Sequence, residues 1–254
     1  MVIGDKIMKK EDGNYINFAI SGMLLFAIFI ILYFFEFRIQ INSLENHITT
    51  GVQMAEDSIL SASSPTTLKD KEKDRFHIII NPYVNEEDIS NSDLTFNELN
   101  QINWLTDYYL SQIKSTFFLD DNNHPTSGEL KNLQYGGIGT LEVSNFTIWE
   151  TVYTDEITTT KFDTHNSNNI KYFIKYDVLI SNNKRSENAI TKKVYLPNSA
   201  KIKGKSIEGS TIDSTIKTSV YLNNVMKKNG LMGVPISKDV QMNIVSAMHD
   251  SRKQ

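Results

Sequence analysis

The side chains that most often carry metal or acid–base chemistry are few in this chain and far apart. Its five histidines stand at positions 47, 77, 124, 165 and 249, and it has no cysteine. None of the histidines has a second histidine or a carboxylate at the spacing of a recognisable metal-ligand motif. We therefore expect each histidine to be a surface residue or to be satisfied by neighbouring groups, and we predict no metal ligand and no cofactor.

Two short stretches have the composition of ligand-binding loops. Residues 120–125 (DDNNHP) offer oxygen ligands, but an EF-hand loop requires glycine at its sixth position and glutamate at its twelfth, where Pro125 and Lys131 stand. Clusters of Asp and Asn mostly make turns, so we predict a turn, with calcium binding as the alternative. Residues 135–139 (YGGIG) lack the preceding strand and the following helix of a phosphate-binding loop, so we predict a turn there as well.

Recognised catalytic signatures are also missing. The chain has no GxSxG and no HExxH motif, which are common signatures of serine nucleophiles and zinc hydrolases. Charged residues make up 22% of the chain and the net charge is -4, a balance typical neither of a disordered polyelectrolyte nor of a basic nucleic-acid binder. The sequence therefore predicts a non-enzymatic protein with no catalytic residue and no nucleic-acid partner.

An apolar stretch near the N-terminus dominates the organisation of the chain. Residues 18–37 (FAISGMLLFAIFIILYFFEF) contain a single charged side chain, Glu36, at the far end. At about 1.5 Å per residue a helix of this length covers roughly the 30 Å hydrocarbon core of a bilayer. We predict a membrane span, and the alternative is a buried core helix. The residues at its end, 36–39 (EFRI), do not form the small-residue cleavage site of a secretory signal, which favours an uncleaved anchor.

The basic residues beside this stretch predict its orientation. Lys6, Lys9 and Lys10 precede it, whereas Arg38 is the only basic residue over the next thirty positions. Basic residues stay on the cytoplasmic side, so we predict a single-pass protein with residues 1–13 as a cytoplasmic leader and the main domain extracytoplasmic, at the cell surface. Since the chain has no cysteine, that domain is stabilised by packing without disulfides, which favours a bacterial surface protein.

Beyond the apolar stretch the pattern becomes amphipathic without a helix breaker, until Ser63-Ser64-Pro65 ends it. Apolar residues recur at spacings of 3, 4, 4, 3, 4 and 3, which places them on one face of a helix. These residues are Ile41, Leu44, Ile48, Val52, Ala55, Ile59 and Ala62. We therefore predict one helix from Tyr15 to Ala62, within a transmembrane and amphipathic segment of residues 14–63. Its apolar face would pack either against its own domain or against neighbouring copies.

The remainder, residues 64–254, predicts an α+β fold: an antiparallel, β-rich extracytoplasmic domain with one covering helix. Thr95 and Glu98 form a capping box, and apolar residues follow at helical spacing as far as Phe117, so we predict a helix of about five turns that covers the sheet. β-branched and aromatic residues predict strands at 76–80, 141–153, 170–181, 189–196 and 210–222. Asn182-Asn183 predicts a hairpin. We expect a short helix over 220–228, and residues 239–249 are ambiguous between strand and helix.

Charge is distributed unevenly along this domain. Residues 81–130 hold nine acidic side chains and one lysine, whereas residues 184–205 hold six lysines and one arginine against one glutamate. Either the two regions are ordinary solvated faces, or they make complementary contacts between neighbouring subunits.

The order of these features resembles the type IV pilins, and more narrowly the TadE-like pseudopilins of tight-adherence pilus systems. In that group a glycine precedes the processing site, a Glu-Phe pair opens the apolar helix, and a second Glu-Phe pair followed by a basic residue closes it. Here Gly13 stands before Asn14, Asn17-Phe18 opens the stretch, and Glu36-Phe37-Arg38 closes it. Asn17 stands in place of the opening glutamate, which in pilins is thought to pair with a neighbour's N-terminus.

The resemblance implies a structural, non-enzymatic minor pilin-like subunit of a bacterial envelope filament or of a secretion or pilus machine. Its partners would be membrane lipid, other pilin-like subunits, the pilus or secretion machinery, and a prepilin peptidase. The implied processing residues are Gly13 and Asn14, and the implied assembly residues are Asn17, Phe18, Glu36, Phe37 and Arg38. The alternative function is a single-pass, membrane-anchored extracytoplasmic binding module for a ligand or a partner protein.

Overall fold

The chain divides into two compact units, Met1–Asn46 and His47–Gln254, and the boundary between them lies inside helix α1 (Ile3–Ser61). The computed structural model describes residues 3–61, 93–127, 130, 136–152, 172–197, 199–202, 204–206, 210–222 and 237–247. The predicted strand at 76–80 lies outside these residues.

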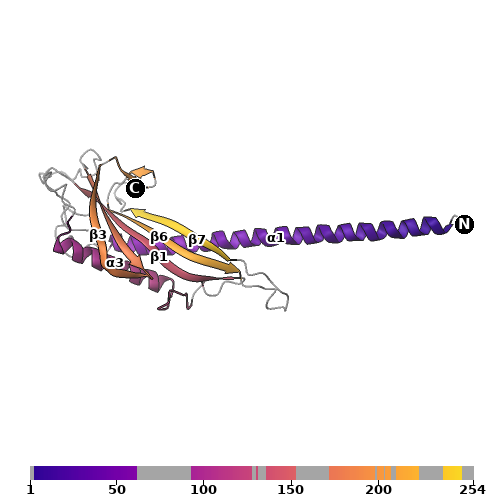
Figure 1. The fold of residues 1–254 in the computed structure, drawn as a ribbon, viewed down its shortest axis with the longest axis horizontal. Helices are drawn as coiled ribbons and strands as arrows, with labels where there is room; N and C mark the ends of the chain where they lie inside the picture. Colours follow the sequence, from indigo (N-terminus) through magenta and orange to yellow (C-terminus); the bar gives the residue numbers. More distant parts are fainter. Residues whose placement is uncertain are drawn as a thin grey trace. The chain divides into compact units, whose positions relative to one another are not determined.

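Helix α1 is continuous from Ile3 to Ser61 and passes through Gly13, Glu36 and Gly51 without a break (Figure 1). The predicted helix from Tyr15 is therefore confirmed as far as Ser61. The helix also starts earlier than predicted, at Ile3, and the added residues contain no proline that would interrupt it. A long N-terminal apolar helix is thus part of the fold.

The second unit is built on a five-stranded antiparallel sheet in the order β3-β2-β1-β6-β7. Its strands are β1 (Gly136–Val152), β2 (Tyr172–Ser181), β3 (Lys184–Pro197), β6 (Thr211–Leu222) and β7 (Ser237–Ala247). A separate two-stranded ribbon consists of β4 (Lys201–Ile202) and β5 (Lys205–Ser206). The predicted α+β class with an antiparallel sheet is confirmed.

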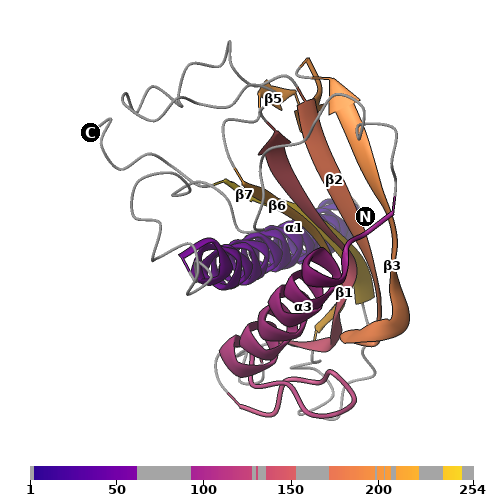
Figure 2. The same ribbon diagram turned by 90° about the vertical axis from the view of Figure 1, so that its left-hand side faces the viewer.

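Among the described residues, two helical segments cover one face of this sheet: α3 (Phe96–Thr116) and residues 47–61 of α1, which we call the docking segment (Figure 2). The Tyr109 ring of α3 stacks on Phe146 of β1, with 4.5 Å between the ring centroids. On β6 every second residue turns to this face, and Ile212, Ser214 and Ile216 are fully buried there. The predicted covering helix is confirmed, and so is its capping box, in which Thr95 and Glu98 bond each other's backbone amides.

The opposite face carries a second, smaller core. Trp149 of β1 and Phe173 of β2 pack there with Ile202 of the ribbon. The central strand β1 is therefore covered on both faces, as its long run of buried residues from Phe146 to Glu150 shows.

A tight turn at Asn182-Asn183 joins β2 to β3, as predicted. Both residues have φ of 52°, the left-handed region that a two-residue hairpin turn requires and that asparagine tolerates. The Asn183 side chain also crosses to β1, where the register shifts on either side of Leu141 and Val143. It accepts a bond from the Val143 amide at 2.7 Å and donates to the Leu141 carbonyl at 2.7 Å.

The structure revises three of the sequence predictions for this unit. The turn predicted at residues 135–139 is wrong over Gly136–Gly139, which form the start of β1. Gly139 suits this position because an added Cβ would overlap the Ser219 hydroxyl of β6 unless that hydroxyl turned away. The helix predicted over 220–228 is wrong at Val220–Leu222, which end β6 by pairing with β1 and β7. The ambiguous residues 239–249 are strand as far as Ala247.

Candidate functional site

The first unit presents an almost wholly apolar surface. Between Tyr15 and Phe35 the large apolar side chains are 41–82% exposed. The most apolar 18-residue window in this part of α1 has a mean hydropathy of 2.6, and none of it is buried. Exposing such a surface to water costs a large free energy, whereas exposing it to lipid tails does not. Residues 18–37 therefore make α1 a candidate membrane span, and the alternative of a buried core helix is wrong.

The docking segment places the amphipathic half of α1 against the sheet and α3. Gly51 faces the ring of Phe117 at the C-terminal cap of α3, so closely that an added Cβ would lie 2.6 Å from Cζ. Thr49 donates to the sulfur of Met242 on β7 at 3.8 Å. Ser58 shares a hydrogen bond of 3.0 Å with the Tyr108 hydroxyl of α3. These contacts hold the docking segment against both α3 and β7.

The predicted apolar stripe is buried within its own domain over this segment. Ile48, Val52, Ala55 and Ile59 are at most 2% exposed. Of the two alternatives for the stripe, packing against the chain's own domain is the one the structure shows for these four residues. Neighbouring copies do not need to cover them.

One acidic side chain lies inside this apolar contact. Glu56 is fully buried, and its Oε1 accepts a hydrogen bond of 2.7 Å from the Ser214 hydroxyl of β6. Its Oε2 has no hydrogen bond of standard geometry among the described residues. Burial raises the pKa of Glu56 from 4.5 to about 7, although the hydroxyls of Ser246 and Ser214 act in the opposite direction.

A second polar network joins the N-terminal turn of α3 to the sheet. Oε1 of Glu98 accepts a bond from the Tyr176 hydroxyl at 3.0 Å and lies 3.4 Å from Nζ of Lys193. Its Oε2 accepts from the amide and the hydroxyl of Thr95. Burial works to raise the pKa of Glu98, but the Thr95 bonds and the Lys193 charge outweigh it and hold that pKa below its ordinary value. The Glu98 carboxylate is therefore ionised, and both of its oxygens accept hydrogen bonds.

Some residues of the acidic and basic regions form ion pairs within the chain. Arg185 of β3 forms a two-pronged ion pair with Asp107 of α3, with both N–O distances at 3.1 Å. Lys193 of β3 pairs with Glu98 of the same helix. These residues of the acidic and basic regions thus meet within one subunit, an arrangement that neither sequence alternative included.

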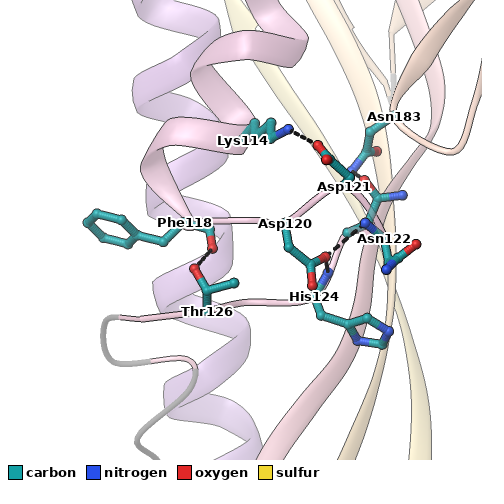
Figure 3. Close-up of polar contacts among 9 residues, drawn as sticks. Lys114, Phe118, Asp120, Asp121, Asn122, His124, Thr126 and Asn183 are labelled. Atoms are coloured by element: carbon teal, nitrogen blue, oxygen red, sulfur yellow. Dashed lines mark hydrogen bonds and ion pairs between the residues drawn. The ribbon is translucent and has the colours of Figure 1, made fainter.

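The Asp-Asn cluster is a turn, as predicted (Figure 3). Oδ1 of Asp120 accepts bonds from the backbone amides of Asn122 and His124, at 2.8 and 2.9 Å. Asp121 pairs instead with Lys114 at 2.7 Å. Both carboxylates thus already have partners that shape the turn. Within the described part of the chain no group of three His, Cys, Asp or Glu residues could hold a metal ion.

The predicted processing and assembly residues all lie in α1. Gly13 and Asn14 fall in its N-terminal part, and the others flank residues 18–37. Asn17, Phe18 and Arg38 are exposed and Phe37 is half-buried, whereas Glu36 is placed only within the helix. All of these residues belong to the first unit, and their roles stay predictions.

Comparison of the chain with family models, with curated proteins and with solved structures finds no match.

Sequence reasoning missed Glu56 and Asn183, although each left a signal. Glu56 lies four residues after Val52 and three before Ile59, a spacing that puts a lone acid on the apolar face of the helix. Asn183 was identified only as a turn residue, because its bonds to β1 depend on a bulge that the sequence does not reveal.

Proposed function

We propose that this chain is a structural, non-enzymatic minor pilin-like subunit, held in a bacterial membrane by residues 18–37 with its N-terminus cytoplasmic and its β-rich domain outside. The observation that carries the proposal is the continuity of α1. One helix contains both the exposed apolar stretch and the docking segment, with no linker between them. An anchor that only tethers a domain does not require such continuity, whereas a subunit that assembles through its helix does.

Assembly would exchange lipid contacts of the span for packing between helices. Small residues let helices approach each other, and in lipid this close packing is a main source of helix association. Ala19 and Gly22 are three residues apart, so they share one face of α1. Around Gly22 an added Cβ would meet no atom of the same chain within 4 Å, which leaves that face open to a neighbour.

Disulfide cross-linking tests this packing directly, because the chain has no cysteine of its own. Single variants Ala19→Cys and Gly22→Cys should form covalent dimers in oxidised native membranes. The matched control Leu24→Cys lies about 200° around the helix from Gly22 and should cross-link far less. Equal cross-linking at all three positions, or none at any, would contradict assembly through this face.

The processing step has its own test. A bulky residue at position 13, as in Gly13→Leu, should abolish a mobility shift that cleavage after Gly13 produces in the parent chain. Asn17→Glu restores the residue that opens the apolar helix in the resembled group and should leave processing intact. If the parent and Gly13→Leu chains have the same size, cleavage at this site does not occur.

A second outcome would favour the alternative function. If the protein stays monomeric in the membrane while its domain retains one ligand or partner through purification, the chain is a membrane-anchored binding module. Cross-linking at positions 19 and 22 separates the two functions, since only the subunit requires contact between copies.

A further inference from the structure

We propose that the contact between the docking segment and the sheet is proton-dependent, with Glu56 held as the neutral acid when the segment is docked. This proton dependence governs how residues 47–61 seat on the sheet, whether or not the chain is a pilin-like subunit. It predicts a helix that is tightly seated at weakly acidic pH and loosened at alkaline pH.

The geometry of the contact provides the first argument. Glu56 is fully buried between α1 and the sheet, where its polar neighbours among the described residues are hydroxyls: Ser214 donates to Oε1 at 2.7 Å, and the Ser246 hydroxyl also acts on the carboxyl group. A buried carboxylate is normally stabilised by several donors or by a cation. A neutral carboxylic acid needs less, since it carries no charge and its own O–H can donate.

The surrounding groups provide the second argument, element by element. From α1 itself the nearest charge is Asp57, and from β6 it is Asp213. From α3 the fully buried Tyr109 hydroxyl faces the same carboxyl group, and β7 contributes the hydroxyl of Ser246. None of these groups is a cation, and both charged ones are acidic. Both acidic groups therefore disfavour an ionised Glu56, and only hydroxyls act in the opposite direction.

The Tyr109 hydroxyl strengthens this reading. It is buried and has no hydrogen bond of standard geometry among the described residues. Burial and the nearby Glu56 raise its pKa well above the ordinary value, so the hydroxyl stays neutral. Oε2 of Glu56 and the Tyr109 oxygen thus belong to one buried cluster around Ser214, in which neither has a hydrogen bond of standard geometry. A proton on Glu56 supplies this cluster with a further donor.

The size of the effect follows from proton linkage. When the segment opens, Glu56 reaches water and recovers its ordinary pKa of 4.5, against about 7 when docked. Raising the pH between these two pKa values ionises Glu56 more in the open state than in the docked state, and therefore favours opening. The equilibrium constant for local opening should rise about 30-fold between pH 5.5 and pH 8.

Hydrogen exchange of the full-length protein in detergent micelles measures this opening. Protection of amides in residues 47–61, corrected for the intrinsic pH dependence of exchange, should fall about 30-fold from pH 5.5 to pH 8. Amides at the centre of β1 and β6 serve as the internal reference. Glu56→Gln should make the protection nearly independent of pH, whereas the matched control Asp57→Asn, which retains Glu56, should stay clearly pH-dependent, with its midpoint shifted to lower pH because one repelling charge is gone.

Two results would overturn the proposal. One is a corrected protection of residues 47–61 that does not change with pH in the parent protein. The other is an Asp57→Asn profile as flat as that of Glu56→Gln.

An infrared measurement covers the case in which Glu56→Gln fails to fold. The parent protein at about pH 6 should show the C=O stretching band of a protonated carboxyl, and the band should vanish by about pH 8.5. It should persist in Glu36→Gln, which removes the acid at the end of the apolar stretch. Absence of the band at the lower pH, or its loss in Glu36→Gln, would also overturn the proposal.

Discussion

Gly51 lies where α1 meets the C-terminal cap of α3, and it gives the first prediction at the residue scale. An added Cβ would lie 2.6 Å and 2.8 Å from two ring atoms of Phe117, and that ring is itself buried. Gly51→Ala gains about 1 kcal/mol of helix propensity but overpacks the contact by about 1 to 3 kcal/mol. We expect a net loss of about 1 kcal/mol in the free energy of unfolding, measured by denaturant titration in micelles.

Thr50→Ala is the matched control, because position 50 is exposed on the same helical turn. It should change stability by less than about 0.5 kcal/mol. Gly51→Ala combined with Phe117→Leu should recover part of the loss through relief of the overlap. Stabilisation by Gly51→Ala alone would show that Phe117 yields without cost.

Asn183 gives a second prediction, in which its backbone and side-chain roles can be separated. Asn182→Gly and Asn183→Gly both keep the positive φ that the turn requires. Only Asn183→Gly removes the bonds to the Val143 amide and the Leu141 carbonyl. We expect it to cost about 1 to 3 kcal/mol of unfolding free energy, because these β1 groups lose their partner.

Asn182→Gly should be neutral within about 0.5 kcal/mol, since glycine also suits this type of turn. Thermal unfolding followed by circular dichroism measures both variants. Similar losses in the two would mean that the turn conformation matters and the bonds to β1 do not.

At the scale of elements, two ion pairs link α3 to β3, and we predict that they differ in strength. The Lys193–Glu98 pair is nearly buried, with side chains 10% and 14% exposed, whereas Arg185 and Asp107 are 23% and 57% exposed. Lys193→Met should cost about 1 to 3 kcal/mol, because Glu98 is left with a buried charge that loses one donor. Arg185→Met should cost less than about 1 kcal/mol.

Salt separates the two variants further. Added sodium chloride should reduce the difference in unfolding free energy between the parent and Arg185→Met, because exposed charges are screened. It should change the difference between the parent and Lys193→Met much less. Unfolding titrations at low and high salt make the comparison. An equal salt effect on both would show that the Lys193 pair behaves as a surface pair.

The elements that could be predicted from the sequence are those whose causes are local. The capping box at Thr95 needs only a residue three positions away, and the hairpin at Asn182-Asn183 needs only its own two residues. The start of β1 could not be predicted because Gly136 and Gly137 are strand residues only through their pairing with Leu222 and Tyr221 of β6, which is distant in sequence. The strand end at Val220–Leu222 likewise depends on two neighbouring strands. The ion-pair partners of Asp107 and Glu98, Arg185 and Lys193, could not be predicted because they depend on β3 lying beside α3.

At the scale of the whole molecule, the absence of cysteine makes the orientation testable with single labels. Lys9→Cys lies before the apolar stretch and Asn182→Cys lies in an exposed turn of the second unit. A membrane-impermeant maleimide added to intact cells should label Asn182→Cys and spare Lys9→Cys, as the basic residues before the stretch predict. Labelling of both after the membrane is opened is the control, and the reverse pattern in intact cells would contradict the orientation.

The pH dependence of global stability combines Glu98 and Glu56. The pKa of Glu98 is lowered in the folded state, so its contribution is complete above its ordinary value of 4.5 and is lost as the pH falls below it. The pKa of Glu56 is raised to about 7, so the neutral acid stabilises the fold fully below 4.5, and this is lost as the pH rises through 7. Together they place maximal stability at weakly acidic pH.

Unfolding titrations from about pH 3 to pH 9 should show a limb on each side of that maximum. The alkaline limb should amount to about 3 kcal/mol, since each unit of pKa difference is worth about 1.4 kcal/mol. Glu56→Gln should flatten the alkaline limb alone, because it removes the buried acid and leaves the Glu98 network with Thr95, Tyr176 and Lys193 in place. Glu98→Gln should reduce the acidic limb alone, since Gln can still accept the Thr95 bond but carries no charge for Lys193. A stability maximum at neutral pH in the parent chain would mean that Glu56 is ionised inside the fold.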